Sequence, residues 1–161
     1  MSLNAIKYNC LTKTDKYPTI LIHGLLGSSN NFMSFVKKTK LLKIMDFYSI
    51  DLPNHGKSLK ISQNFNLENL ANHVADFMEQ NNIEKANLIG HSLGGKVAMF
   101  LALKNCEKVE KMVIEDISPV DKYEKDSSNF KYFIECFRKI DFGTIKNRKE
   151  ADDILAKYIH V

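Results

Sequence analysis

Short apolar runs and amphipathic stretches alternate along the first 120 residues. The apolar runs occupy residues 18–22, 46–50, 86–89 and 111–114, and each stops at polar or glycine-containing residues. Runs of this length bounded by turn residues are typical of buried strands. Residues 4–11 predict one further, short edge strand.

Helical periodicity separates these runs. From Leu67 to Met78 apolar residues repeat every three or four positions, which predicts a helix that starts after Asn66 as its N-cap and ends in Gln80-Asn81-Asn82. A shorter pattern includes Phe32, Phe35 and Val36, and residues 94–104 form a third helix. Alternating strands and helices predict an α/β fold, with a parallel, doubly wound sheet and helices on both faces.

The chain changes in character after Pro119. Residues 121–161 hold 17 charged residues in 41, against 25 in the preceding 120, and only one of the seven glycines. Apolar positions at 130–137 and 154–159 predict two helices, separated by Asp141-Phe142-Gly143. We therefore expect a core over residues 1–120 and a helical segment over residues 121–161.

Candidate chemistry gathers in three loops that hold six of the seven glycines, each directly after a predicted strand. In a parallel sheet such loops share the carboxyl edge, where ligands bind. Gly90-His91-Ser92-Leu93-Gly94 has the G-x-S-x-G spacing of a nucleophile elbow between a strand and a helix. The alternative interpretation of Ser92 is a helix-capping serine.

The same spacing predicts donors for a developing oxyanion. One is the N–H of Leu93, at the N-terminus of the following helix. A second is expected from His23-Gly24-Leu25-Leu26-Gly27, as the N–H of Leu25 or, failing that, of Leu26. We interpret His23 as a supporting residue that hydrogen-bonds this loop rather than as a base, and treat His55 and His91 similarly.

Composition and charge exclude several other classes of function. The net charge of +4 comes from lysines interleaved with acids, so nucleic acid is not an expected partner. Cys10, Cys106 and Cys136 lack the spacing of a zinc site or disulfide framework, which predicts no metal and a reducing compartment. No export signal or membrane span is visible, so we expect a cytoplasmic protein, with an organelle as the alternative. The oligomeric state stays open.

Three segments together resemble the α/β-hydrolase superfamily: residues 23–28, 51–58 and 90–96. Ile114-Glu115-Asp116-Ile117-Ser118-Pro119 resembles its small acyl-esterase branch, which includes bacterial esterases and mitochondrial abhydrolase-domain proteins. The resemblance covers about residues 18–121, and the charged segment after it has the position of the family's cap. It implies a serine, acid and histidine triad without any cofactor.

The resemblance places two triad members and leaves the third open. Ser92 is the implied nucleophile, and Asp116 the preferred acid, with Glu115 less favoured because neighbours on a strand face opposite sides. The alternative is an acid one strand later, where the superfamily often has it, beyond the residues of this sequence. The family places its histidine after the acid, where this sequence has only His160, the penultimate residue. We therefore expect a chain truncated relative to the family pattern, with negligible activity alone and an open sheet edge.

Three functions are consistent with these residues. The first is a serine esterase or thioesterase that hydrolyses small acyl esters through an acyl-enzyme. The second keeps the fold but has other chemistry, as a carbon–carbon hydrolase or a menaquinone-pathway lyase. The third, suggested by the absent histidine, is a non-catalytic or vestigial ligand-binding protein. The acyl-chain length and physiological substrate are not readable from the sequence.

Overall fold

The structure is a computed structural model that describes residues 3–12, 15–63, 65–120, 123–141 and 143–159, with only the backbone for residues 123–130. The chain divides into two compact units, Met1–Pro119 and Val120–Val161. Each unit is described by itself below. Among the described residues, no helix has the length and apolar character needed to cross a bilayer.

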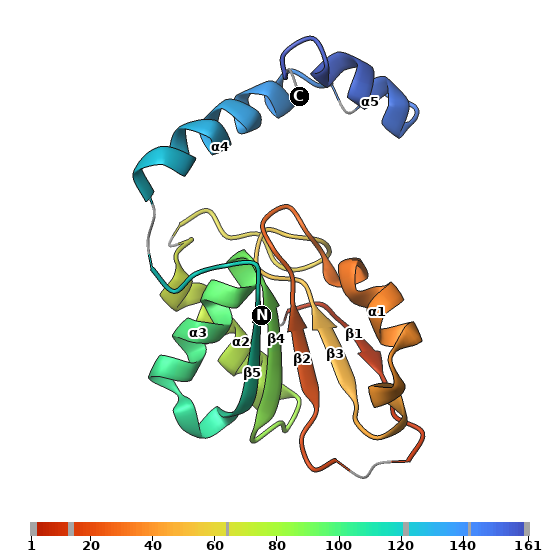
Figure 1. The fold of residues 1–161 in the computed structure, drawn as a ribbon, viewed down its shortest axis with the longest axis vertical. Helices are drawn as coiled ribbons and strands as arrows, with labels where there is room; N and C mark the ends of the chain where they lie inside the picture. The colour runs from red at the N-terminus through yellow and green to blue at the C-terminus, as the bar shows by residue number, and fades with distance from the viewer. Residues whose placement is uncertain (1–2, 13–14, 64, 121–122, 142, 160–161) are drawn as a thin grey trace. The chain divides into compact units, whose positions relative to one another are not determined.

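The first unit is built on a five-stranded sheet with the order β1-β3-β2-β4-β5 (Figure 1). Its strands are β1 (Ala5–Tyr8), β2 (Thr19–Ile22), β3 (Phe47–Ile50), β4 (Ala86–His91) and β5 (Val109–Glu115). β1 runs antiparallel to β3, and the other neighbours are parallel. The predicted edge strand and four parallel strands are therefore confirmed.

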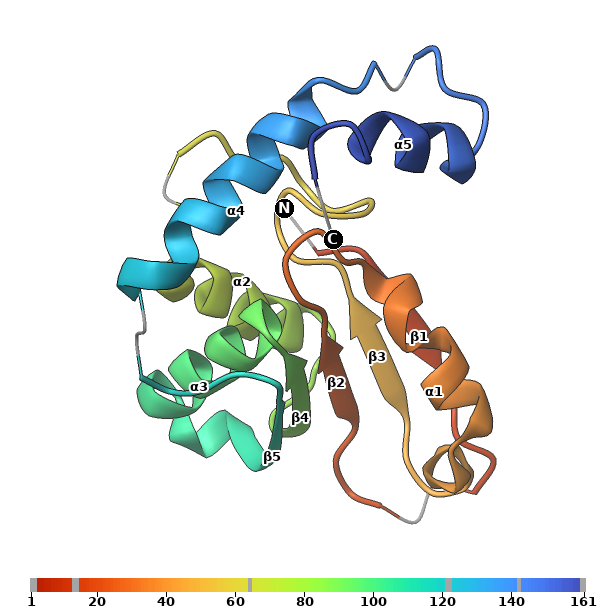
Figure 2. The same cartoon turned by 45° about the horizontal axis from the view of Figure 1, so that its top comes forward.

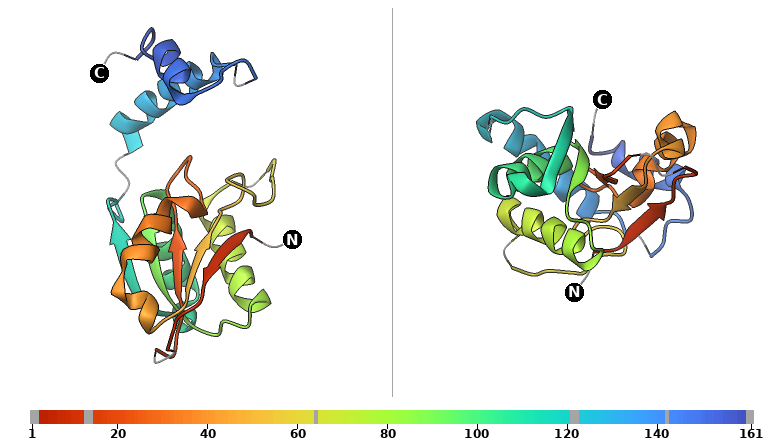
Figure 3. Two further views of the ribbon diagram at one scale, coloured as in Figure 1. Left: turned by 90° about the vertical axis from the view of Figure 1, so that its right-hand side faces the viewer. Right: turned by 90° about the horizontal axis from the view of Figure 1, so that it is seen from below.

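Helices cover both faces of this sheet, as predicted. Figure 3 shows α1 (Met33–Lys38) and α2 (Leu67–Gln80) on opposite sides. α2 and α3 (Leu93–Lys104) bury the larger core, which includes Ile20, Ile50 and Leu88. On the other face, the short helix η1 (Ser29–Phe32) and α1 pack over Leu21 and Phe47. Two further short helices are η2 (Lys40–Lys43) and η3 (Cys106–Lys108).

The sequence locates both ends of α2 correctly but misplaces the beginning of β5. Asn66 caps α2, because its side-chain oxygen accepts the N–H of Asn69 at 2.9 Å, and the helix ends at Gln80 as predicted. β5 begins two residues earlier than the apolar run indicates. Its charged start is paired, since Glu110 forms a 2.8 Å ion pair with Lys85, which precedes β4.

The second unit contains α4 (Tyr123–Arg138) and α5 (Arg148–Leu155), the two predicted helices. Asn147 caps α5 by accepting the N–H of Glu150 at 3.1 Å. The helix ends at Leu155, so Tyr158 and Ile159 lie in turns after it rather than on its face. The carbonyl of Tyr158 is held by the hydroxyl of Tyr132 on α4. Phe142 lies outside the described residues.

Candidate active site

Three glycine-containing loops meet at the carboxyl edge of the sheet. They follow β2, β3 and β4, which are parallel neighbours, and Figures 1 and 2 show the first two side by side beyond the arrowheads. The loop after β2 spans residues 23–28 and is called the β2 loop. The loop after β3 spans residues 51–58 and is called the β3 loop.

Ser92 stands at a sharp bend between β4 and α3. Its φ of 51° and ψ of −115° lie in a region that only glycine adopts freely. It holds the N-cap position of α3, yet its side chain makes no capping hydrogen bond. The helix-capping interpretation therefore has no support in the geometry. Strain at such a residue is a common mark of functional sites.

Glycines allow the backbone to close around this bend. A Cβ on Gly94 would lie 2.1 Å from the carbonyl oxygen of Ile22, and one on Gly90 would lie 2.4 Å from the carbonyl oxygen of Gly94. A Cβ on Gly24 would lie 3.3 Å from the Cβ of Ser92 and 2.9 Å from Nδ1 of His91. The β2 loop therefore lies directly against Ser92.

The backbone amides of the β2 loop are not equivalent. The N–H of Leu26 donates to Nε2 of His55 at 3.2 Å, and Leu26 has a positive φ of 61°. This bond removes the Leu26 N–H as the fallback oxyanion donor. The amides of Leu25 and Leu93 have no hydrogen-bond acceptor within the described part of the chain.

The end of β5 lies beside Ser92. His91 pairs with Glu115 in the β4–β5 ladder, and the N–H of Ser92 donates to the carbonyl of Glu115 at 3.0 Å. Asp116, the next residue, is therefore level with Ser92 in the sheet. It is exposed and has a positive φ of 54°. Glu115 faces a different direction, because it lines a pocket together with His91.

The histidines fall into two groups. His23 and His55 are buried, and both nitrogens of each ring contact the backbone. Neither has a nitrogen available to take a proton from Ser92. The ring of His91 has no hydrogen-bond partner among the described residues, and it lines the pocket described below. His160 lies outside the described residues.

Asp51, the first residue of the β3 loop, anchors the start of η1 and the β3 loop itself, a role that sequence reasoning missed. Its carboxylate accepts the N–H of Ser29 at 2.5 Å, the amide of Asn4 at 2.7 Å and the N–H of Lys57 at 2.9 Å. Burial alone would raise the pKa of Asp51, but these hydrogen bonds outweigh burial and lower it. Asp51 is therefore a buried structural carboxylate. The sequence signals for it are its place directly after an apolar strand and its position at the start of the 51–58 segment that resembles the family.

A pocket of about 630 Å³ opens on the α1 face of the sheet. His23, Asn31, His91 and Glu115 line its polar end, and the apolar lining consists of Phe32, Phe35, Ile89, Val113 and Ile114. His91 directly precedes Ser92 in the chain, and Ser92 itself does not line this pocket. The pocket is large enough for a small ligand.

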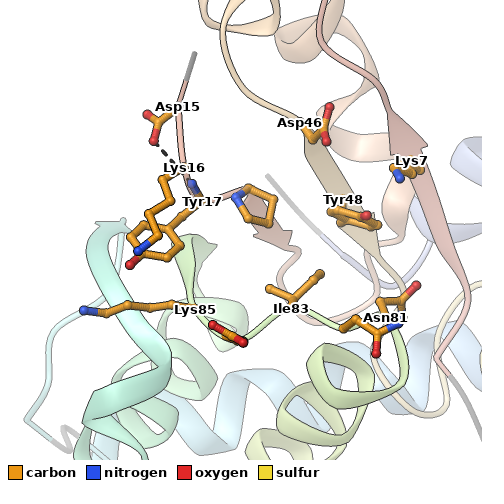
Figure 4. Close-up of a pocket in the computed structure, with 12 residues that line it drawn as sticks. Lys7, Asp15, Lys16, Tyr17, Asp46, Tyr48, Asn81, Ile83 and Lys85 are labelled. Carbon is orange, nitrogen blue, oxygen red and sulfur yellow. Dashed lines mark hydrogen bonds between the residues drawn. The ribbon is translucent and has the colours of Figure 1, made fainter. Parts of the chain in front are cut away.

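A second hollow, of about 340 Å³, lies at the opposite end of the strands (Figure 4). Figure 4 shows Lys16 and Lys85 beside Tyr17, with their Nζ atoms 5.0 and 5.8 Å from the ring centroid. No serine, cysteine or histidine lines it. In the described ranges, no three His, Cys, Asp or Glu side chains form a group that could hold a metal ion. The candidate chemistry therefore stays at the carboxyl edge.

Comparison with known proteins identifies the family of the chain. The family model described as alpha/beta hydrolase fold matches residues 17–148. Ethanol acetyltransferase 1 of Wickerhamomyces ciferrii is 32% identical over 152 residues, covering 88% of this chain and 37% of its own length. The sn-1-specific diacylglycerol lipase ABHD11 of Danio rerio is 34% identical over 151 residues, covering 91% and 47%.

A solved structure described as a marine microorganism esterase has the same fold. It superposes with a TM-score of 0.84 at 32% identity, covering 99% of this chain and 59% of that one. The chain thus spans less than half the length of the two curated relatives named above. Sequence motifs, sheet order and family match agree, and this chain belongs to the α/β-hydrolase fold family.

Proposed function

We propose that this chain carries the nucleophile and the oxyanion donors of a serine hydrolase that acts on small acyl esters or thioesters. The observation that carries the proposal is the strained Ser92, held at a strand–helix bend against Gly24 of the β2 loop. Ser92 is half-buried, and a serine hydroxyl beside unpaired backbone amides is the arrangement that acyl transfer needs.

The reaction proceeds through an acyl-enzyme. Ser92 Oγ attacks the ester carbonyl and loses its proton to a base, while the amides of Leu25 and Leu93 donate to the oxyanion. The intermediate then collapses, the alcohol or thiol leaves with a proton, and water releases the acid by the same route. Asp116 is the proposed acid that orients the base, because it is level with Ser92 in the sheet.

The base is the one member that the described residues do not supply. For residues 1–161 alone we therefore expect ester turnover close to background. Loss of the triad histidine lowers turnover by about a millionfold in subtilisin, which sets the scale. The family fold supports an enzyme. The expectation of turnover close to background applies to residues 1–161 alone.

The test uses an extended chain in which residues 1–161 are followed by the carboxyl-terminal part of the marine microorganism esterase. We expect it to hydrolyse short p-nitrophenyl esters and to lose this activity in Ser92→Ala. Ser34→Ala, an exposed serine on α1, is the matched control and should leave turnover unchanged. Full activity in Ser92→Ala would reject the proposal.

Acyl transfer to an alcohol is a second candidate, favoured by the similarity to ethanol acetyltransferase 1. Both reactions share the acyl-enzyme, and they differ in whether water or an alcohol attacks it. Ethanol added to the extended chain distinguishes them. A transferase yields the ethyl ester in proportion to ethanol, whereas an esterase yields mainly the free acid.

A further inference from the structure

Two buried histidines join the β2 loop to the β3 loop by reciprocal hydrogen bonds. His23, at the start of the β2 loop, accepts the N–H of Leu52 from the β3 loop at 3.1 Å. His55, in the β3 loop, accepts the N–H of Leu26 from the β2 loop at 3.2 Å. Each loop thus donates one backbone amide to the histidine of the other. We call this arrangement the histidine clasp.

The second nitrogen of each ring binds a carbonyl of its own loop. Nδ1 of His23 lies 2.7 Å from the carbonyl oxygen of Gly24, and Nδ1 of His55 lies 2.9 Å from that of Pro53. A carbonyl oxygen only accepts and a backbone N–H only donates. All four bonds therefore form together only when both rings are neutral and carry their proton on Nδ1.

The surroundings of the clasp disfavour a positive charge. His23 is 1% exposed and His55 is 8% exposed, and their ring centroids are 4.9 Å apart. Burial lowers the pKa of His23, and the neighbouring His55 lowers it further. The Gly24 carbonyl and the Asp51 carboxylate act in the opposite direction. The other groups near the pair are His91 and Glu115, which share the pocket with His23, and the Phe65 ring, stacked on His55.

We propose that His23 and His55 are positioning residues that hold the β2 loop in shape for a substrate oxygen, and that protonation of His23 in acid breaks its bond to the Leu52 amide and loosens the clasp. The bond to His55 turns the Leu26 amide away and fixes its left-handed backbone, which leaves the Leu25 amide as the donor. A protonated Nε2 carries a hydrogen that faces the donating amide, so that bond is lost. The catalytic part of this inference rests on the proposed function, whereas the hydrogen-bond arrangement does not.

The first test follows the clasp itself by NMR in residues 1–161. Long-range ¹H–¹⁵N spectra at pH 8 should show both rings in the Nδ1–H form. Leucine labelled with ¹⁵N reports Leu25, Leu26 and Leu52 in one spectrum. On acidification we expect the Leu52 amide to shift as His23 gains a proton. An Nε2–H form of either ring at pH 8 would overturn the proposal.

Variants separate positioning from folding. In His23→Gln the side-chain oxygen can accept the Leu52 amide without titrating, so the pH response of that amide should disappear while its position is kept. His55→Leu should displace the Leu26 amide, and His55→Gln should keep it in place. His73→Gln, on α2, is the matched control and should preserve the wild-type response of both amides. A pH response that persists in His23→Gln would contradict the proposal.

The second test measures catalysis in the extended chain. We expect His55→Leu to lower kcat about 10²-fold with KM little changed, because the lost positioning acts on the transition state. His55→Gln, whose side-chain oxygen can still accept the Leu26 amide, should restore kcat to within a few-fold. Equal losses in both variants would overturn the positioning role. If the extended chain has no activity while the NMR result holds, the proposed function fails and the clasp stands.

Discussion

The N–H of Ser92 donates to the carbonyl of Glu115 across 3.0 Å, which extends the β4–β5 ladder one residue beyond the last paired position. This bond fixes Ser92 although its backbone is strained, and it sets Asp116 level with Ser92. Both residues have a positive φ, as does Leu26 in the β2 loop. Three strained, non-glycine residues thus gather where three strand ends meet.

The strain at Ser92 predicts that a glycine there stabilises the fold. Ser92→Gly should raise the free energy of unfolding by about 1 kcal/mol, because glycine relieves the unfavourable φ at a modest entropic cost. Urea unfolding of residues 1–161 measures the change. Ser34→Gly, on helix α1, should lower stability by about 0.5–1 kcal/mol. A stability loss in Ser92→Gly would show that the bend is unstrained.

Close backbone packing predicts that Gly94 cannot be replaced. Its Cβ in Gly94→Ala would meet the carbonyl of Ile22 at 2.1 Å, and backbone atoms of two elements would have to move. We expect a loss of about 2–3 kcal/mol or failure to fold. Gly143→Ala is the control, because its Cβ would meet only a side-chain oxygen of Asp141, at 3.2 Å. Equal effects of the two substitutions on the urea midpoint would contradict this account.

Much of the fold follows from local patterns, since apolar runs and helical periodicity locate the buried elements. The beginning of β5 does not, because Glu110 and Lys111 are exposed and charged in an outer strand. An outer strand with solvent on one side needs no apolar run to pair with its neighbour. Its pairing depends on β4, which local sequence does not encode.

The site was predictable to a similar degree. The G-x-S-x-G spacing locates the bend at Ser92, since a nucleophile elbow depends on residues within five positions. The contact between Leu26 and His55 joins residues 29 positions apart, and it arises only once β2 and β3 are neighbours. Sequence reasoning assigned supporting roles to His23 and His55 without locating the amides that they bind. It found no role for Asp51.

The hydrogen bonds of Asp51 predict that replacing this residue destabilises the fold. Asp51→Asn replaces one of the two acceptor oxygens by a donor, which then faces either the N–H of Ser29 or the two donors of Asn4 and Lys57, and should cost about 2–3 kcal/mol. Asp76→Asn, exposed on α2, should change stability by less than about 0.5 kcal/mol. Both values come from urea unfolding at pH 7. If Asp51→Asn left the free energy of unfolding unchanged, these hydrogen bonds would contribute no net stability.

The lowered pKa values of Asp51 and His23 predict stability that is lost in acid. In each case the unfolded chain binds a proton more readily than the folded chain, so stability falls as pH decreases. The His23 contribution is complete above about 6.5 and declines below it, and that of Asp51 declines below about 3.8. The urea concentration at the unfolding midpoint, measured from pH 8 to pH 3, should decrease within each of these two pH ranges. His23→Gln should flatten the upper range, and His73→Gln should not.

The register of β5 predicts which carboxylate serves the proposed reaction. Asp116 is level with Ser92, whereas Glu115 lines the pocket with His91. In the extended chain, Asp116→Asn should lower kcat by about 10³–10⁴-fold, because a neutral amide does not stabilise the protonated base. Glu115→Gln is the matched control and should retain kcat within a few-fold. The reverse order of effects would move the acid role to Glu115, and small effects in both would place the acid outside these residues.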